Sequence, residues 1–91
     1  MTATARSFRV TGRVQGVAFR AWTRSTALGL GLSGWVRNES DGSVTGHIEG
    51  PRTAVDQMVT QLHEGPGAAS VRAVETGDAV PEGAAGFEIR R

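Results

Sequence analysis

The sequence predicts one α+β domain over residues 1–91, built as a two-layer sandwich with two helices on an antiparallel sheet. The chain has 91 residues, which suits a single hydrophobic core. Its apolar residues alternate between a period of two, typical of strands, and a period of about 3.6, typical of helices. An Asp-Gly pair also separates two strand-like runs, which favours a hairpin.

The first third of the chain is patterned as a strand and then as a helix. On residues 6–13, Phe8 and Val10 share one face, which Gly12 and Val14 continue. A helix is predicted from about residue 19 to residue 28, with Gly29 near its end. We expect the inward stripe of this helix to consist of Ala18, Ala21, Trp22, Ser25 and Leu28.

The rest of the chain predicts a hairpin, a second helix and two further strands. Residues 32–38 and 43–49 are strand-like and flank the turn Glu39-Ser40-Asp41-Gly42. Pro51 suits the first turn of a helix, which Gly65-Pro66 should end. Weaker strands are predicted at 71–76 and 86–90, separated by a loop over 77–85. The apolar positions of the second helix are Val55, Met58, Val59 and Leu62.

This order of elements is the ferredoxin-like βαββαβ pattern with a short extra strand at the C-terminus. In that topology the first two strands run parallel and the third lies between them, so the first two end at the same edge of the sheet. Asn38 ends the second strand and should therefore lie roughly 10 Å, two strand spacings, from the end of the first. Arg20, at the start of the first helix, and Asn38 are expected to converge on one ligand.

Residues 12–20 predict a site for an anion. Glycines bracket a turn between the first strand and the first helix, so backbone N–H groups can converge at the positive end of the helix. Arg20 adds a planar, permanent charge that suits bidentate contact with phosphate. No Gly-Lys-Ser/Thr ends the turn, which disfavours a nucleotide-binding P-loop.

Charge is distributed unevenly along the chain. Residues 1–38 contain six arginines and no acidic residue, whereas the remainder contains nine acidic residues and four arginines, for a net charge of +1. This asymmetry favours a small anion near the N-terminal half, because a nucleic-acid binder usually carries a larger basic excess. We interpret Arg6, Arg9 and Arg24 as solvated surface residues without a ligand.

Several classes of chemistry are disfavoured by composition. The chain has no cysteine, so disulfides and thiol chemistry are excluded, and no run is apolar enough for a signal or membrane segment. We therefore expect a cytoplasmic protein. His47 and His63 stand apart from each other and from any carboxylate cluster, and we expect them to be solvated or capping. The sequence predicts neither a metal nor a cofactor.

Two longer patterns resemble the signatures of the acylphosphatase family. The first signature is similar to Gly12-x-Val14-Gln15-Gly16-Val17-x-Phe19-Arg20. The second is similar to Gly34-Trp35-Val36-Arg37-Asn38-x-x-Asp41-Gly42-x-Val44, followed by Gly50. The similarity continues from Arg6 to the closing Phe87-x-Ile89-Arg90. The resemblance implies that Arg20 and Asn38 are catalytic and that the phosphate cradle is the backbone of Arg13, Val14, Gln15, Gly16, Val17 and Ala18.

The resemblance also implies a reaction: hydrolysis of the carboxyl-phosphate bond of small acyl phosphates, without a metal. The residue types suit this chemistry, because Arg20 and the loop amides can neutralise the phosphoryl oxygens. The Asn38 amide can both accept from and donate to a water molecule, and so hold it in line. A carboxylate is a good leaving group, and no general base is evident, so we expect the substrate's own phosphate to accept the proton of the water.

Some interpretations stay open at this level. A non-catalytic regulatory domain would bind an anion with the same cradle, and only activity discriminates the two. An RNA-binding module is disfavoured because the first strand offers one aromatic residue, Phe8, which is patterned with the core. We therefore expect an acyl phosphate as partner, no nucleic acid, no membrane, and a monomer.

The remaining residues of the two motifs receive structural interpretations. We expect Gln15 to brace the turn through a hydrogen bond and Gly16 to serve backbone geometry. Phe19 and Trp22 are interpreted as core residues, and Trp35 as a half-exposed residue beside the site.

Overall fold

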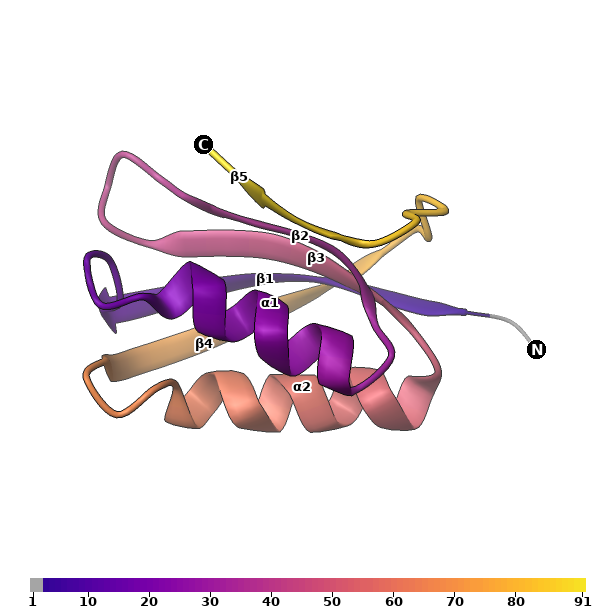
Figure 1. Ribbon diagram of the computed structural model, residues 1–91, viewed down its shortest axis with the longest axis horizontal. Coiled ribbons are helices and arrows are strands. Elements are labelled where there is room, and N and C mark those ends of the chain that lie inside the picture. Colours follow the sequence, from indigo (N-terminus) through magenta and orange to yellow (C-terminus); the bar gives the residue numbers. More distant parts are fainter. Residues whose placement is uncertain (1–2) are drawn as a thin grey trace.

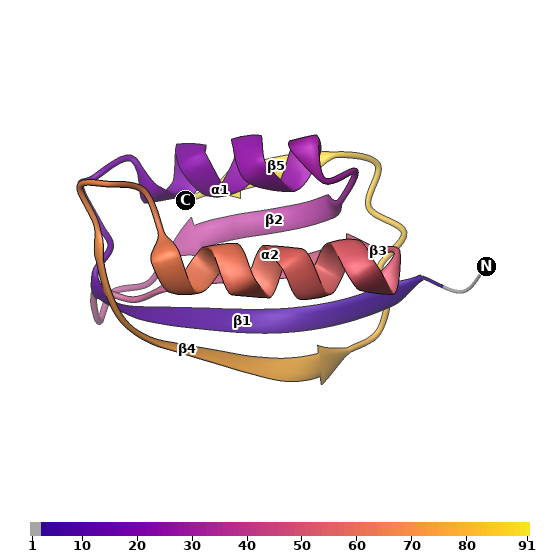
Figure 2. The ribbon, with the colours of Figure 1, turned by 90° about the horizontal axis from the view of Figure 1, so that it is seen from below.

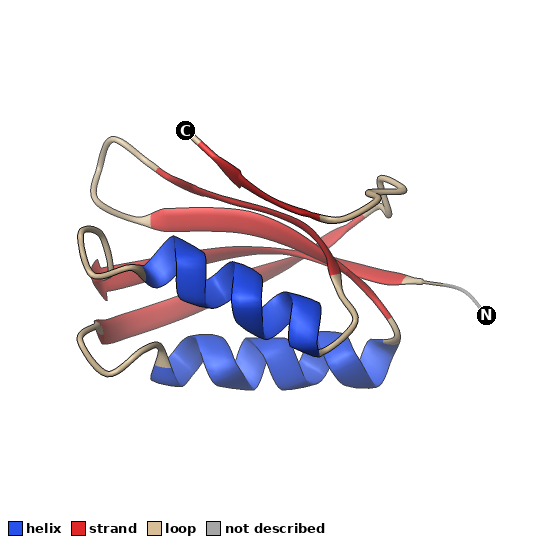
Figure 3. Cartoon of the chain, in the orientation of Figure 1, coloured by secondary structure: helices blue, strands red, loops and turns tan. Residues whose placement is uncertain are grey.

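The computed structural model describes residues 3–91 and arranges them as a sheet covered on one face by two helices (Figures 1 and 3). The predicted domain also includes Met1 and Thr2, which lie outside the described residues. The elements in chain order are β1 (Thr4–Arg13), α1 (Phe19–Gly29), β2 (Ser33–Asn38), β3 (Val44–Gly50), α2 (Arg52–Glu64), β4 (Ser70–Ala79) and β5 (Phe87–Arg90).

The strands lie in the order β4-β1-β3-β2-β5. Both β1 and β2 pair antiparallel with β3, so they run parallel to each other with β3 between them, as predicted. The sheet is mixed and not purely antiparallel, because β5 pairs parallel with β2. β4 ends beside the start of β1. The connection over residues 80–86 then crosses that end of the sheet to the opposite edge, where β5 runs parallel to β2 (Figure 2).

The hairpin and α2 were predicted correctly. The backbone N–H of Glu39 donates to Ser43 O at 2.8 Å, and Gly42 has a φ of 93°, which closes the turn between β2 and β3. Pro51 directly precedes α2 as its N-cap residue. The strong apolar repeat of this helix correctly predicts its buried face, because Val55, Met58 and Leu62 are fully buried.

The predicted inward stripe of α1 was wrong. The buried residues of this helix are Phe19, Thr23 and Ala27, one turn apart. Of the predicted residues only Trp22 packs against the core, while Ala18, Ala21, Ser25 and Leu28 are exposed. The helix carries few large apolar residues, so the bulk of Phe19 and the register of the turn before it determine which face is buried.

The last two strands also differ from their predicted bounds. β4 continues to Ala79, beyond the predicted end at residue 76, so the loop between β4 and β5 spans residues 80–86. Pairing with β1 extends from Ala5 to Arg13 and holds the weakly patterned residues of β4 in the sheet. Long-range hydrogen bonds therefore overrode the local preference for a loop.

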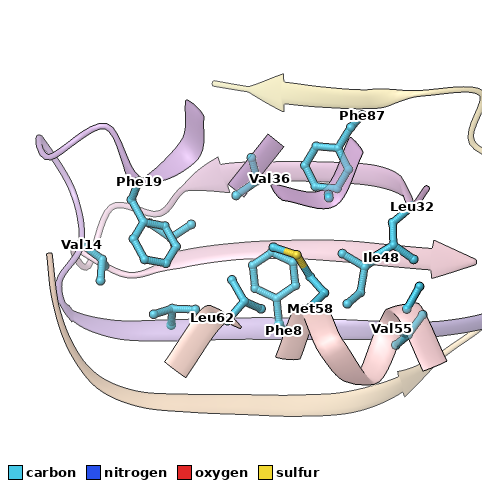
Figure 4. Close-up of a cluster of buried hydrophobic side chains, with 14 residues drawn as sticks. Phe8, Val14, Phe19, Leu32, Val36, Ile48, Val55, Met58, Leu62 and Phe87 are labelled. Atoms are coloured by element: carbon cyan, nitrogen blue, oxygen red, sulfur yellow. The ribbon is translucent and has the colours of Figure 1, made fainter. Parts of the chain in front are cut away.

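The hydrophobic core lies between the sheet and the two helices, and Figure 4 labels ten of its side chains. Val14 and Phe19 belong to it, and both are almost completely buried. These two residues stand at either end of the turn over 15–18, so the core anchors both ends of that turn.

Candidate active site

A cavity of about 180 Å³, partly open to solvent, lies where the ends of β1 and β2 meet the start of α1. Arg20 and Asn38 both line it, as the topology predicts. Because β1 and β2 run parallel through the crossover helix, the chain brings these two residues to one edge of the sheet. The cavity is lined by Val14, Gly16, Ala18, Phe19, Arg20, Ala21, Asn38 and Ile89.

The turn before α1 has the backbone geometry of an anion site. Gly16 has a φ of 74°, and Ala18, the N-cap residue, has φ 60° and ψ 26°, a left-handed conformation. A residue with a Cβ in this conformation costs about 1–2 kcal/mol, and such strain tends to occur at functional sites. Left-handed residues in a turn make successive N–H groups form an anion-binding concavity.

The N-terminus of α1 is free of competing groups. Ala18 makes no side-chain hydrogen bond to the first turn, and that turn contains no acidic residue. The first N–H groups of a helix have no partner within the helix, and they carry the positive end of its dipole. An anion in the cavity would therefore be stabilised here.

Gln15 braces the turn, as expected. Its Nε2 donates to the carbonyl oxygens of Glu39 at 2.8 Å and Ser43 at 2.9 Å, which ties the turn to the β2–β3 hairpin. Of the six residues predicted to form the cradle, Val14, Gly16 and Ala18 line the cavity. Arg13, Gln15 and Val17 do not line it, and a cradle role for their backbone N–H groups stays a prediction.

Arg20 lies in the first turn of α1 and is partly buried. Its Nη1 donates to the backbone oxygen of Arg90 at 3.3 Å, and within residues 3–91 it forms no salt bridge. Its charge is therefore not neutralised by a carboxylate, and the guanidinium keeps donors for a ligand.

Asn38 is the last residue of β2, held in register opposite Val44. Its Oδ1 atom is buried and has no hydrogen-bond partner in the part of the chain that the structure describes. An unsatisfied buried acceptor costs about 1–3 kcal/mol, so folding alone does not favour this arrangement. Such atoms in native proteins often have a functional role.

The two acidic residues of the β2–β3 turn are paired. Hydrogen bonds from Thr45 and from Arg37 hold the pKa of Glu39 below its ordinary value. The side chain and backbone of Ser43 do the same for the pKa of Asp41, which also pairs with Arg9. No lining residue of the cavity is an Asp, Glu, His or Tyr, so it offers no side chain that would act as a general acid or base at neutral pH.

Three other arginines of the N-terminal half, Arg6, Arg9 and Arg24, have protein partners. Arg9 pairs with Asp41, Arg6 lies 3.8 Å from Asp78, and Arg24 Nε donates to Phe87 O at 3.1 Å. None of the three lines the cavity. They are surface residues with protein partners and not the purely solvated residues expected from the sequence.

The expectation of a solvated His47 was wrong. His47 and Glu49 are each 4% exposed although they lie on the sheet face away from the helices, and His47 Nε2 is 3.1 Å from Glu49 Oε2. The backbone N–H groups of Glu82 and Ala84 donate to the Glu49 carboxylate, so the segment 80–86 covers this face. The alternating pattern of the strand does not predict that a distant segment buries His47 and Glu49. His63 is exposed in the last turn of α2, as expected.

Trp35 is half-buried as expected, but it does not line the cavity. Its ring lies under the guanidinium groups of Arg90 and Arg37, at 4.5 and 5.2 Å from the ring centroid. Its Nε1 donates to Glu82 Oε1 at 3.3 Å, which connects the ring to the segment 80–86. Within residues 3–91, no group of three or more His, Cys, Asp or Glu residues is arranged to hold a metal.

A sequence model of the family described as Acylphosphatase matches residues 6–89. The chain belongs to the acylphosphatase family. It is 52% identical to an acylphosphatase of Azoarcus sp. (strain BH72), over 96% of this chain and 89% of that protein. It is 57% identical to an acylphosphatase of Rhizobium meliloti (strain 1021), over 91% of this chain and 88% of that protein. Membership of the acylphosphatase family makes the chain a hydrolase.

Solved acylphosphatases have the same fold. An acylphosphatase from Coxiella burnetii superposes with a TM-score of 0.93 at 38% identity, covering 97% of this chain and 93% of that one. The acylphosphatase from Bacillus subtilis gives 0.94 at 32% identity, covering 99% of this chain and all of that one. Separately, within residues 3–91, no helix is long and apolar enough to cross a membrane.

Proposed function

We propose that the chain hydrolyses the carboxyl-phosphate bond of small acyl phosphates by positioning one water molecule against a bound phosphoryl group. The observation that supports this most directly is a single cavity that contains three complementary features. Within residues 3–91, these are an arginine without an acidic partner, an asparagine whose side-chain oxygen has no hydrogen-bond partner, and a helix N-terminus without a side-chain cap.

Arg20 and the backbone N–H groups of residues 13–18 bind the phosphoryl oxygens. Phosphoryl transfer depends mainly on positioning and on neutralising charge at these oxygens. The guanidinium supplies a full positive charge, and the helix N-terminus adds a partial one, in a turn that Gln15 and the core keep rigid. Because this charge comes from the chain itself, we propose that the reaction needs no metal ion.

Asn38 positions the nucleophile. Its Oδ1 accepts a hydrogen bond from the water, and its Nδ2 group remains available as a donor. The water attacks phosphorus in line with the bond to the carboxylate, and this P–O bond breaks with its electron pair going to the leaving carboxylate. A carboxylate leaves as an anion at neutral pH, so no general acid is needed.

The proton of the water passes to a phosphoryl oxygen of the substrate. Among the described residues that line the cavity there is no Asp, Glu, His or Tyr that could accept the proton, which supports this route. A substrate-assisted reaction predicts that kcat, measured from roughly pH 5 to pH 8, shows no titration that disappears on substitution of a side chain. A titration that is lost in one variant would assign the proton to that side chain instead.

Turnover of benzoyl phosphate in the presence of a chelator tests the proposal. We expect rapid hydrolysis by the wild type, near-complete loss in Arg20→Gln, and a fall of about 100- to 1000-fold in kcat for Asn38→Ala. Arg24→Gln is a matched control, because Arg24 lies one turn along the same helix outside the cavity, and it should keep its activity. An inactive wild type that still binds phosphate would favour a non-catalytic anion-binding domain.

The remaining expectations are also proposals. We propose that residues 1–91 form one domain, which the single core and sheet of residues 3–91 support. We propose a cytoplasmic monomer that binds no nucleic acid. The burial of Phe8 supports the last point, because β1 then presents no aromatic ring for base stacking.

A further inference from the structure

The cavity has an apolar side that the phosphate chemistry does not use. Arg20, Asn38 and the turn provide the polar contacts, whereas Ala18, Ala21 and Ile89 add aliphatic surface. Among these aliphatic residues Ile89 is large, and it is 42% exposed. An exposed isoleucine at the mouth of a cavity offers apolar surface that a ligand can cover.

The register of β5 determines where the Ile89 side chain lies. Phe87 and Ile89 alternate with Glu88 and Arg90, and Phe87 is buried in the core, so Ile89 faces the helix side of the sheet. Ile89 stands opposite Val36 of β2. Asn38 follows Val36 by two residues and shares its face, so Ile89 flanks Asn38 at the cavity.

The position of β5 explains why this side chain remains uncovered. β5 is an edge strand of the sheet and Ile89 is its next-to-last residue, so within residues 3–91 no further strand pairs with β5 on its outer side. On the helix side, α1 presents Ala21, a small side chain, toward the cavity. Ala21 and Ile89 therefore both border the cavity, which is partly open to solvent.

We propose that Ile89, with Ala18 and Ala21, forms a subsite for an apolar acyl group of the substrate. This inference rests on the proposed function and adds a substrate preference to it. A substrate whose phosphoryl group is held by Arg20 must direct its acyl group out of the turn, and Ile89 lies beside that path. The chain prefers acyl phosphates with an aromatic or branched aliphatic acyl group over acetyl phosphate.

Truncation of Ile89 tests the subsite. We compare kcat/KM for benzoyl phosphate with kcat/KM for acetyl phosphate in the wild type and in Ile89→Ala. An apolar contact of this kind changes specificity roughly tenfold, so the benzoyl-to-acetyl ratio should fall by about that factor. Ile89→Gln, which keeps most of the bulk of the side chain but makes it polar, should lower the ratio as well. The inhibition constant of inorganic phosphate, which has no acyl group, should change far less.

Leu28 provides a matched control. It is 44% exposed, lies at the C-terminal end of α1 and does not line the cavity, so Leu28→Ala should leave the ratio unchanged. A ratio that stays constant in both Ile89 variants would overturn the subsite while leaving the proposed hydrolysis intact. A wild type that hydrolyses neither substrate would instead overturn the proposed function itself.

Discussion

The Glu49 carboxylate joins the sheet to the segment 80–86 by accepting two backbone hydrogen bonds from that segment. Its Oε2 accepts the N–H of Glu82 and its Oε1 the N–H of Ala84, both at 2.6 Å, and His47 Nε2 lies 3.1 Å from Oε2. Glu49→Gln keeps the shape of the side chain but removes its charge. It also replaces one accepting oxygen with an NH₂ group, which cannot accept from a backbone N–H.

These contacts determine how much free energy of unfolding Glu49→Gln should lose. A hydrogen bond to a charged group contributes about 1.5–3 kcal/mol, and a buried donor left without an acceptor adds a penalty of similar size. Because Gln keeps one acceptor, we expect Glu49→Gln to lower the free energy of unfolding by about 2–4 kcal/mol at pH 7.

The contribution of Glu49 depends on pH with a defined sign. Burial would raise the pKa of Glu49, but hydrogen bonds from His47 and from the N–H groups of Glu82 and Ala84 outweigh it and hold the pKa below its ordinary value. A depressed pKa in the folded state gives stability that is complete above the unfolded carboxyl pKa of about 4.3. This stability is lost as the pH falls through the folded pKa. Acid should therefore reduce the difference in free energy of unfolding between the wild type and Glu49→Gln.

Urea unfolding followed by tryptophan fluorescence measures both effects. We would record it at pH 7 and at several values from roughly pH 5 to pH 2. Glu88→Gln is the control, because Glu88 is exposed and forms a surface ion pair with Arg90, and it should change stability little. The proposed contribution of Glu49 would be refuted by a Glu49→Gln protein as stable as the wild type at pH 7. It would also be refuted by a difference in free energy of unfolding that stays constant in acid.

Three further predictions concern the turn and the sheet. Gly46→Ala would place a Cβ 2.3 Å from the Phe8 ring and 2.4 Å from Trp35 O, so urea unfolding should show a loss of about 3 kcal/mol, and a loss below 1 would contradict this packing. Ala18→Val forces a β-branched residue into a left-handed conformation at the N-cap, so phosphate affinity measured by calorimetry should fall roughly tenfold, and unchanged affinity would show that this turn does not hold the anion. Gln15→Ala removes two hydrogen bonds to the hairpin and should lower the free energy of unfolding by about 1–2 kcal/mol. It should also lower the affinity for phosphate. If both quantities stay unchanged, Gln15 does not brace the turn.

The parts of the fold with strong local patterns were predictable from sequence. The apolar repeat of α2 identified Val55, Met58 and Leu62 as buried, and the Asp-Gly pair identified the hairpin turn. The handedness of the crossover then brought Arg20 and Asn38 to one cavity, although 18 positions separate them in the sequence. Connection rules thus predicted the geometry of the candidate site better than helical periodicity predicted the face of α1.

Features that depend on distant chain segments were not predictable. The burial of His47 and Glu49 requires the segment 80–86 to cross their face, and that segment has no periodic pattern. The exposure of Leu28 and the burial of Thr23 depend on how the turn before α1 orients the helix. Likewise, tertiary packing leaves Asn38 Oδ1 without a partner among residues 3–91, whereas residue type alone only predicts that an amide usually finds a partner.

The central claim is a division of labour, in which Arg20 holds the phosphate and Asn38 holds the water. The most direct measurement is the affinity for inorganic phosphate, by calorimetry, of the wild type, Arg20→Gln and Asn38→Ala. We predict that Asn38→Ala binds phosphate within roughly threefold of wild type despite its loss of turnover, whereas Arg20→Gln loses most of its affinity. Normal phosphate affinity in Arg20→Gln, or an equal loss in both variants, would contradict the account.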